Sequence, residues 1–330
     1  MIGTVIDSAM DLTVAPGYTK IGFRVRRALG WEPLEPGCMR GRRVIVTGAN
    51  SGLGLASART LRALGAHVHI VVRDRGKGES AAEQIDGHGE GAVDVEVCDL
   101  SSLSSIRSFA TRFSSSHRGL DVLINNAGVM TDERDLSVDG HELTYATNVL
   151  GMFVLTNELL GQLVSAAPSR IINVSSGGMY TARLDVGDLE SGRGDFDGPS
   201  AYAHSKRAEV VLTELWAERL RGWGIVVHAM HPGWADTPGV QRSLPRFHRV
   251  TAPLLRSPEE GSDTISWLAA AAEPAQSTGL FWHDRRPRST HRVPWTRESE
   301  ADRRALWEAC VRDGGPNSAR TEDILSRGSP

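Results

Sequence analysis

Tyr202 and Lys206 are the two side chains whose types and spacing point most directly to chemistry. They stand four residues apart in the segment YAHSK, so on a helix both would face the same side. A tyrosine is a useful acid near neutral pH only when its pKa, about 10 when free, is lowered. A nearby ammonium has this effect because it stabilises the phenolate. The pair predicts proton transfer to an oxygen that becomes negative, although a solvated helix face would show the same spacing.

Two adjacent serines, Ser175 and Ser176, follow an apolar run that ends at Val174. A hydroxyl at the end of a strand could donate a hydrogen bond to a reacting oxygen and stabilise its charge. On the residues alone, either serine could fill this role.

A glycine-rich segment, TGANSGLG, spans Thr47–Gly54 between a predicted strand and a predicted helix. Glycines permit a tight turn and a close backbone approach to a pyrophosphate, which the N–H groups at the start of the helix can bind. A plain turn is the alternative, and the spacing is TGxxxGxG rather than GxGxxG. The residues predicted to bind a dinucleotide here are Gly48, Asn50, Ser51, Gly52, Leu53 and Gly54.

The residues after the second and third predicted strands bear on which dinucleotide binds. Arg73 stands where a Rossmann fold meets the adenosine ribose, and an arginine there suits a 2′-phosphate. We therefore predict NADP(H), with NAD(H) as the alternative in which Asp74 binds the ribose and Arg73 is a surface charge. Asp99 and Leu100 are predicted to contact the adenine, although Asp99 could instead cap a helix.

Short apolar runs alternate with helical patterns along most of the chain, and this order must position the residues above. The order predicts an α/β fold, a Rossmann-type doubly wound parallel sheet of about seven strands in a three-layer αβα arrangement. Ligands bind such sheets beyond the carboxyl ends of the strands, where the motifs lie. Strands are predicted over 44–46, 68–72, 93–97, 121–125, 171–174, 225–230 and 279–282, and helices over 53–64, 142–164 and 202–220.

Three regions are predicted along the 330 residues: an N-terminal extension (1–41), a dinucleotide-binding and catalytic domain (42–285) and a C-terminal extension (286–330). In the first, Tyr18, Ile21, Val25 and Leu29 could share a helix face beside basic residues. Such a helix could lie on a membrane surface, but packing across the domain is the favoured interpretation. The last region is expected to be helical near 299–311 and mobile near its end, from Gly314 to Pro316.

Composition excludes several classes of protein. Lys and Arg number 37 against 40 Asp and Glu, a net charge of −3, so a nucleic-acid partner is not expected. Three separated cysteines and eleven scattered histidines show no CxxC or HExxH-like pattern, so neither a disulfide framework nor a metal site is predicted. The chain shows no membrane-spanning run and no secretory pattern, and we expect a cytoplasmic protein.

The motifs taken together resemble the short-chain dehydrogenase/reductase family. They are TGANSGLG, NNAG at Asn125–Gly128, Ser176 and YAHSK, in this order over about residues 42–285. A resemblance to an orphan branch near the retinol-dehydrogenase-like enzymes comes from four further segments. They are VSSGGM, HPGWADTPGV, DRRPRSTH and, in the N-terminal extension, Gly17–Lys20. The resemblance implies a carbonyl reductase or alcohol dehydrogenase that uses NAD(P), with Tyr202 as the acid and base.

The resemblance also implies roles for residues that the chemistry alone does not single out. It favours Ser176 over Ser175, lets Lys206 also hold the nicotinamide ribose, and makes Asn148 the asparagine that positions a relay water, although a satisfied buried amide is the alternative. Asn125 is expected to be structural. Residues implied to line the path of the cofactor, besides Tyr202 and Lys206, are Asn126, Ala127, Gly128, Pro232, Gly233 and Thr237.

The substrate side is less specific. The 25 residues between Ser176 and Tyr202 and the loop from Trp234 to Leu255 both carry apolar side chains, which favours a hydrophobic carbonyl or alcohol as the small-molecule substrate. A homo-oligomer through the helices that carry Asn148 and Tyr202 would follow the family, but the tail leaves this open. Rival functions are a catalytically silent dinucleotide sensor and a membrane-peripheral protein. The presence of both Tyr202 and Lys206 counts against a silent sensor.

Overall fold

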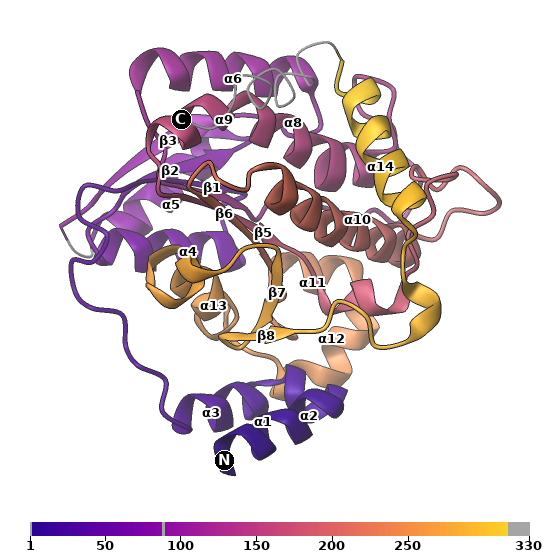
Figure 1. The fold of residues 1–330 in the computed structure, drawn as a ribbon, viewed down its shortest axis with the longest axis horizontal. Coiled ribbons are helices and arrows are strands. Elements are labelled where there is room, and N and C mark those ends of the chain that lie inside the picture. The colour runs from indigo at the N-terminus through magenta and orange to yellow at the C-terminus, as the bar shows by residue number, and fades with distance from the viewer. Residues whose placement is uncertain (1, 88–89, 316–330) are drawn as a thin grey trace.

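A central sheet of eight strands organises the computed structural model, which describes residues 2–87 and 90–315 (Figure 1). The strand order is β3-β2-β1-β4-β5-β6-β7-β8, and all neighbours are parallel except β7 and β8. The strands are β1 (Arg43–Thr47), β2 (His67–Val72), β3 (Ala92–Val97), β4 (Val122–Asn125), β5 (Ser169–Val174), β6 (Ile225–Met230), β7 (Leu280–His283) and β8 (Arg286–Arg288). The predicted Rossmann-type fold is confirmed.

Helices cover both faces of the sheet, and each layer closes one hydrophobic core. One face carries α6 (Leu103–Ser116), α8 (Met152–Glu158), α9 (Leu160–Ser165) and α10 (Gly198–Arg219), and the other carries α4 (Gly52–Ala63), α5 (Arg75–Asp86) and α13 (Pro258–Ala270). The central strands β1, β4, β5 and β6 are buried almost throughout, as their runs of Val and Ile predict.

The helix predicted over 142–164 is present but irregular, because it consists of four consecutive segments interrupted only at Leu159. They are α7 (Leu143–Tyr145), a π-helical turn at Ala146–Gly151, α8 and α9. A Cβ on Gly151 would lie 2.1 Å from the carbonyl oxygen of Leu100, so the backbone of the π-helical turn passes against the end of β3. Such π-turns inside α-helices occur frequently at functional sites, and this one carries Asn148.

The eighth strand was not predicted. It forms a hairpin with β7 whose two turn residues, Asp284 and Arg285, have φ values of 52° and 55°. Positive φ at both central positions is the type I′ geometry that fits the twist of a hairpin. Asn-Gly or Asp-Gly would have signalled this turn, and Asp-Arg does not.

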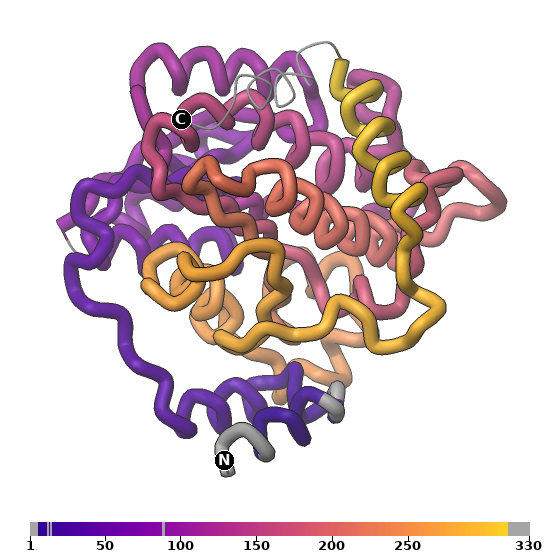
Figure 2. Tube along the Cα trace, in the orientation of Figure 1, coloured from indigo at the N-terminus to yellow at the C-terminus, as the bar shows by residue number. Residues whose placement is uncertain are grey.

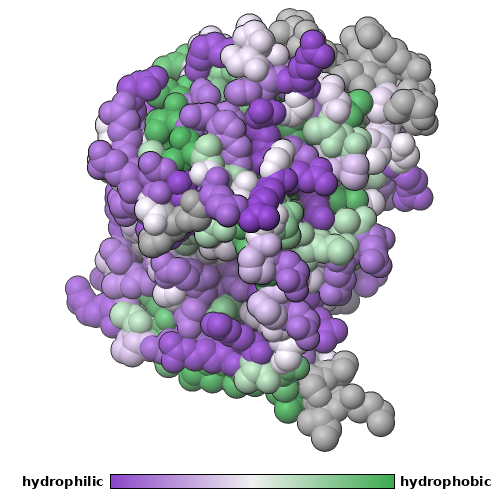
Figure 3. Space-filling model, turned by 90° about the vertical axis from the view of Figure 1, so that its left-hand side faces the viewer, coloured by the Kyte–Doolittle hydropathy of each residue, from purple (hydrophilic) through white to green (hydrophobic). Residues whose placement is uncertain are grey.

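The N-terminal extension forms three helices, α1 (Ile2–Leu12), α2 (Val14–Tyr18) and α3 (Lys20–Ala28), and an extended run then returns to β1 (Figure 2). The predicted apolar face is wrong, because extended backbone at Thr19 separates α2 from α3. Phe23 and Arg26 are buried, whereas Ile21 and Leu29 are 47% and 42% exposed. Hydrophobic side chains gather along this lower edge of the molecule (Figure 3).

The tail runs along α10 and ends the described part of the chain. Trp307 of helix α14 (Glu300–Asp313) packs edge-to-face against Trp216 of α10, with ring centroids 5.9 Å apart, and Arg303 pairs with Glu218 at 2.7 Å. Of the end predicted to be mobile, Gly314 and Gly315 are described and Pro316 lies outside the described residues. Shorter helices are α11 (Pro238–Ser243), α12 (Pro245–Thr251) and 3₁₀ turns at Gly177–Thr181, Ala252–Leu254, Glu273–Gln276 and Pro294–Thr296.

None of the helices in these ranges combines the length and the hydrophobicity needed to cross a lipid bilayer.

Candidate active site

A cleft of about 180 Å³ opens at the carboxyl ends of the strands, where the strand order reverses between the neighbours β1 and β4. This is the switch point at which doubly wound sheets bind their ligands. The cleft brings together nine of the predicted residues: Leu53, Asn126, Gly128, Ser176, Tyr202, Lys206, Pro232, Gly233 and Thr237. A larger cavity of about 520 Å³ lies at the opposite edge, beside Arg42 and Asp121, and holds none of them.

Helix α10 carries both Tyr202 and Lys206 in its first turns. The helix begins four residues before Tyr202, because the side chain of Asp197 caps it by accepting from the N–H of Ser200 at 3.0 Å. Pro199 in the first turn is a second start signal. Lys206 Nζ lies 5.4 Å from the centre of the Tyr202 ring, so the ammonium and the phenol share one face as predicted.

The ammonium of Lys206 is held by two buried acceptors. Its Nζ donates to the carbonyl of Val174 at 3.0 Å and to Glu209 Oε1 at 2.7 Å, and the Lys206 and Glu209 side chains are each only 3% exposed. Burial alone would lower the pKa of Lys206, but the charge of Glu209 raises it above its ordinary value. Lys206 therefore stays protonated.

Glu209 is a residue of the site that the sequence analysis missed. Burial raises the pKa of its carboxyl to about 7, although Lys206 opposes the shift. Its position three residues after Lys206, on the same helical face, was the available signal. Glu209 thus binds the same ammonium that faces the ring of Tyr202.

The structure separates the roles of the two serines. Ser175 is buried and donates its hydroxyl to the carbonyl of Lys206 at 2.8 Å, which ties the end of β5 to α10. Ser176 lines the cleft, and its oxygen accepts from the N–H of Gly178 at 3.1 Å. That bond uses a lone pair of Ser176, so its hydrogen can be donated to a ligand in the cleft.

Asn148 sits behind the cleft with every polar atom of its side chain bonded. Its Oδ1 accepts from the N–H of Val129 at 2.8 Å, and its Nδ2 donates to the Val129 carbonyl and to Ser205 Oγ, both at 2.9 Å. This is the geometry of a satisfied buried amide. The amide thus holds the segment that follows Gly128. A Cβ on Gly128 itself would lie 3.1 Å from Lys206 Nζ.

The glycine-rich turn fits a dinucleotide. Gly48 has a φ of 66°, and a Cβ on Gly54 would meet Asn126 Nδ2 and the Gly48 carbonyl oxygen, both at 2.6 Å. Ser51, at the N-cap of α4, makes no capping hydrogen bond with its side chain, so backbone donors at this helix end remain for an anion.

The turn is braced by the segment after β4, which holds the predicted Asn126 and Ala127. Both backbone N–H groups donate to Thr47 Oγ1, at 2.9 and 3.0 Å, and Asn126 Nδ2 donates to the Thr47 carbonyl at 2.8 Å. Asn125, expected to be structural, is buried and donates to Thr156 and Asn173.

Arg73 and its neighbours at the end of β2 lie outside the cleft, at the same edge of the sheet. Arg73 is exposed, whereas Asp74 caps α5 by accepting from the N–H of Lys77 at 2.8 Å. At the end of β3, Asp99 Oδ1 accepts from both the N–H and the hydroxyl of Ser101, and the side chain of Leu100 is buried. Ser102 rather than Asp99 caps α6.

The loop after β6 forms one wall of the cleft. Thr237 caps α11 and lies against Gly52, where a Cβ would meet its Cγ2 at 3.4 Å. Val129, Met130 and Val240 add apolar surface. The insert between Ser176 and Tyr202, whose apolar side chains favoured a hydrophobic substrate, contributes no residue to the cleft, and its Met179 and Leu184 are buried elsewhere.

Tyr18 of the N-terminal extension wedges between two segments of the site. Its ring packs on His231 at a centroid distance of 4.6 Å, and its carbonyl accepts from the N–H of Trp234 at 2.8 Å. A Cβ on Gly177 would lie 2.8 Å from the ring, and one on Gly233 would lie 2.6 Å from the Tyr18 carbonyl oxygen. The extension thus braces the turn after Ser176 and the loop after β6.

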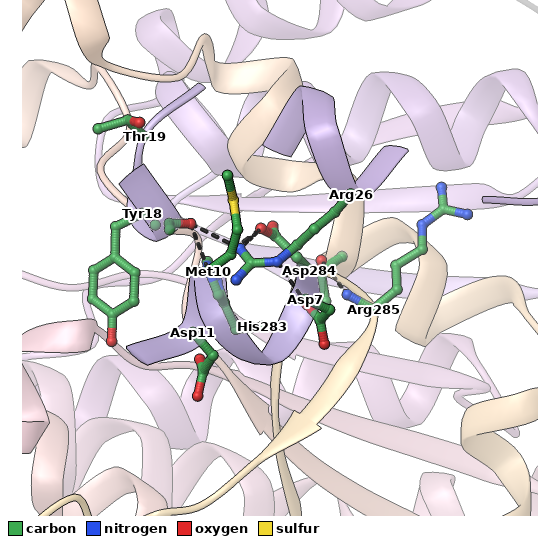
Figure 4. A network of polar contacts seen from close by, with 12 residues as sticks. Asp7, Met10, Asp11, Tyr18, Thr19, Arg26, His283, Asp284 and Arg285 are labelled. Carbon is green, nitrogen blue, oxygen red and sulfur yellow. Dashed lines mark hydrogen bonds and ion pairs between the residues drawn. The ribbon is translucent and has the colours of Figure 1, made fainter. Parts of the chain in front are cut away.

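A buried ionic network holds this wedge (Figure 4). The carboxylate of Asp284, 2% exposed, accepts from Arg26 at 2.6 Å and from two nitrogens of Arg256 at 2.6 and 2.8 Å. Arg256 also donates to the Pro232 carbonyl, and Arg26 pairs with Asp7. Burial alone would raise the pKa of Asp284, but the two guanidinium groups hold it below its ordinary value.

Comparison with known proteins adds a family and named relatives. The family model for short chain dehydrogenases matches residues 42–246. The chain is 45% identical over 263 residues to dehydrogenase/reductase SDR family member 12 of Bos taurus, covering 79% of this chain and 82% of the relative. It is 39% identical over 247 residues to retinol dehydrogenase 12 of Bos taurus, covering 74% and 78%.

A solved structure points to the cofactor class. A short chain dehydrogenase from Burkholderia cenocepacia in complex with NADP superposes with a TM-score of 0.59 at 25% identity, covering 74% of this chain and 96% of that one.

Proposed function

This chain belongs to the short-chain dehydrogenase family and is an NAD(P)-dependent oxidoreductase of alcohol and carbonyl groups, and we propose that it uses NADP(H) on a hydrophobic small molecule. The observation that carries the proposal is the convergence of Ser176, Tyr202 and Lys206 on one cleft beside a turn that fits a dinucleotide.

Each residue has a distinct part in the proposed reaction. The nicotinamide, when bound, supplies or accepts the hydride. Tyr202 donates a proton to the oxygen of a reduced carbonyl, or removes one from an alcohol. The ammonium of Lys206 stabilises the phenolate, and Ser176 donates a hydrogen bond to the same oxygen. Asn148 acts behind them by fixing the Val129 segment.

Replacing Tyr202 with phenylalanine tests the acid role. The variant should lose turnover while its affinity for NADPH, measured by fluorescence titration, stays unchanged. Tyr180→Phe is the control, because Tyr180 lies outside the cleft. Ser175→Ala is not suitable, because Ser175 ties β5 to α10. Retained turnover in Tyr202→Phe would remove Tyr202 from the acid role.

The preference for NADP(H) follows from Arg73 and Asp74. Arg73 is exposed at the ribose edge, where its guanidinium can meet a 2′-phosphate. Asp74, the candidate ribose ligand in an NAD(H) enzyme, has one carboxylate oxygen engaged in capping α5. The kcat/KM for NADPH should exceed that for NADH, and the opposite order would reject this assignment.

The apolar part of the cleft wall favours a hydrophobic substrate. Val129, Met130 and Val240 face the same space as Tyr202. NADPH oxidation across a panel of ketones, aldehydes, quinones and steroids should rank apolar carbonyls first. A silent dinucleotide sensor would bind NADPH and reduce none of them.

A further inference from the structure

Three histidines and two acidic residues meet far from the cleft, near the amino end of β2. His67 and His69 alternate along β2 and so point to one face of the sheet, and the register pairs His69 with Asp94 of β3. Glu96 follows two residues later on the same face of β3. His117, the C-cap of α6, closes over them, and its ring lies 4.8 Å from that of His69.

The potential ligand atoms are already close. His67 Nε2 lies 2.6 Å from Asp94 Oδ2, and His69 Nδ1 lies 3.8 Å from that oxygen and 3.6 Å from Glu96 Oε1. One ligand atom from each of His67, His69 and Asp94 falls within 4.8 Å of the others. Tetrahedral ligands at about 2.1 Å from a zinc ion stand about 3.4 Å apart, so side-chain shifts of about 1 Å would suffice.

The strongest evidence for a ligand at this cluster is the side chain of His69. The side chain is fully buried, and neither of its ring nitrogens has a hydrogen-bond partner. A buried polar group without a partner is unfavourable, and native proteins seldom contain one. A cation at this point would bind the lone pair of one nitrogen, next to two carboxylates.

The charges around the cluster suit a cation. Arg43 of β1 lies beside the cluster and donates to the Gly119 carbonyl at 3.1 Å. The carboxylates of Asp94 and Glu96 together outweigh its charge.

We propose that His67, His69 and Asp94 bind a divalent transition-metal cation of the zinc class, with Glu96 placed to serve as a fourth ligand. Imidazole and carboxylate donors select zinc, nickel or cobalt over calcium and magnesium, which take oxygen ligands. Asp94 is 53% exposed, so the ion can enter from solvent. β3 is the edge strand of the sheet, and the ion would pin it to β2.

Titration calorimetry with zinc chloride on the full chain, after removal of metals with a chelator, tests the proposal. We expect one saturable equivalent per chain and a rise in melting temperature with zinc. His67→Gln and Asp94→Asn should each weaken binding by about tenfold or more. Both side chains are partly exposed, so these variants should fold, which His69→Phe need not do.

A matched control is available in a second group of like composition among the described residues. His141 lies 3.1 Å from Glu190, with Asp313 nearby, and Tyr145 donates to Asp313. His141→Gln should leave zinc binding unchanged. Loss of binding in His141→Gln with retention in His67→Gln would place the ion at the second group and overturn the proposal, as would the absence of any saturable binding.

Discussion

Replacing Asp284 with asparagine should lower the free energy of unfolding by about 3 kcal/mol. Removing one partner from a buried ion pair typically costs about 3–5 kcal/mol, because a desolvated charge loses its counter-charge. The lower end of this range applies here, because both arginines keep other acceptors. Arg26 keeps Asp7 at 2.8 Å, and Arg256 keeps only carbonyl acceptors besides the amide of the variant. Asparagine tolerates positive φ, so the turn adds no strain.

Urea or thermal unfolding near pH 7 measures this loss, and the melting temperature should fall by about 4 °C. The pKa of Asp284 lies below its ordinary value, so its contribution is fully present above about pH 4 and is lost as the pH falls further. The difference between variant and parent should therefore be constant from pH 5 to 8 and shrink only in strong acid.

Asp263→Asn is the matched control. Asp263 pairs with Arg285, the next residue along the turn, through two contacts of 2.8 Å, but the pair is partly exposed. These two side chains are 11% and 21% exposed, so solvent screens the pair more than the Asp284 network, and the control should cost less than Asp284→Asn. If Asp284→Asn costs no more than this control, the network does not hold the N-terminal helices to the site and the reasoning fails.

Three further predictions concern the site. Arg73→Gln should raise the KM for NADPH about tenfold or more while leaving that for NADH nearly unchanged, as steady-state kinetics would show. Ser176→Ala should lower kcat by about a hundredfold with little loss of stability, whereas Ser175→Ala should show the reverse pattern in kinetics and unfolding. Burial raises the pKa of Glu209 to about 7. Its contribution to the free energy of unfolding is therefore fully present below about pH 4 and is lost as the pH rises through 7. Glu209→Gln should abolish this pH-dependent loss of up to about 3 kcal/mol, as unfolding measured at pH 5 and at pH 8 would show.

The sheet and its cleft could be predicted because their signals are local. Runs such as Val44–Val46 mark buried parallel strands, and parallel strands bring their carboxyl ends to one edge whatever lies between them. Tyr202 and Lys206 needed only the helical repeat. The signals for β8 and for the π-turn are weaker. Each depends on one local backbone geometry, and no Asn-Gly or similar turn sequence marks it.

Contacts between distant segments could not be predicted in this way. Tyr18 reaches His231 across more than 200 residues, and Asp284 recruits arginines from α3 and from the segment before α13. Hydrophobic periodicity says nothing about such pairs. The histidine cluster could not be predicted for the same reason, since metal-binding motifs space their ligands along one segment, whereas His67, Asp94 and His117 come from three.

Helix α14 changes what α10 can offer to other molecules. Trp307 and Arg303 occupy the outward side of α10 through Trp216 and Glu218. A second subunit approaching along α10 would contact α14 first, because α14 of the same chain already packs on that side of α10. Any symmetric pairing on this flank must be built from α14 itself or begin with its release.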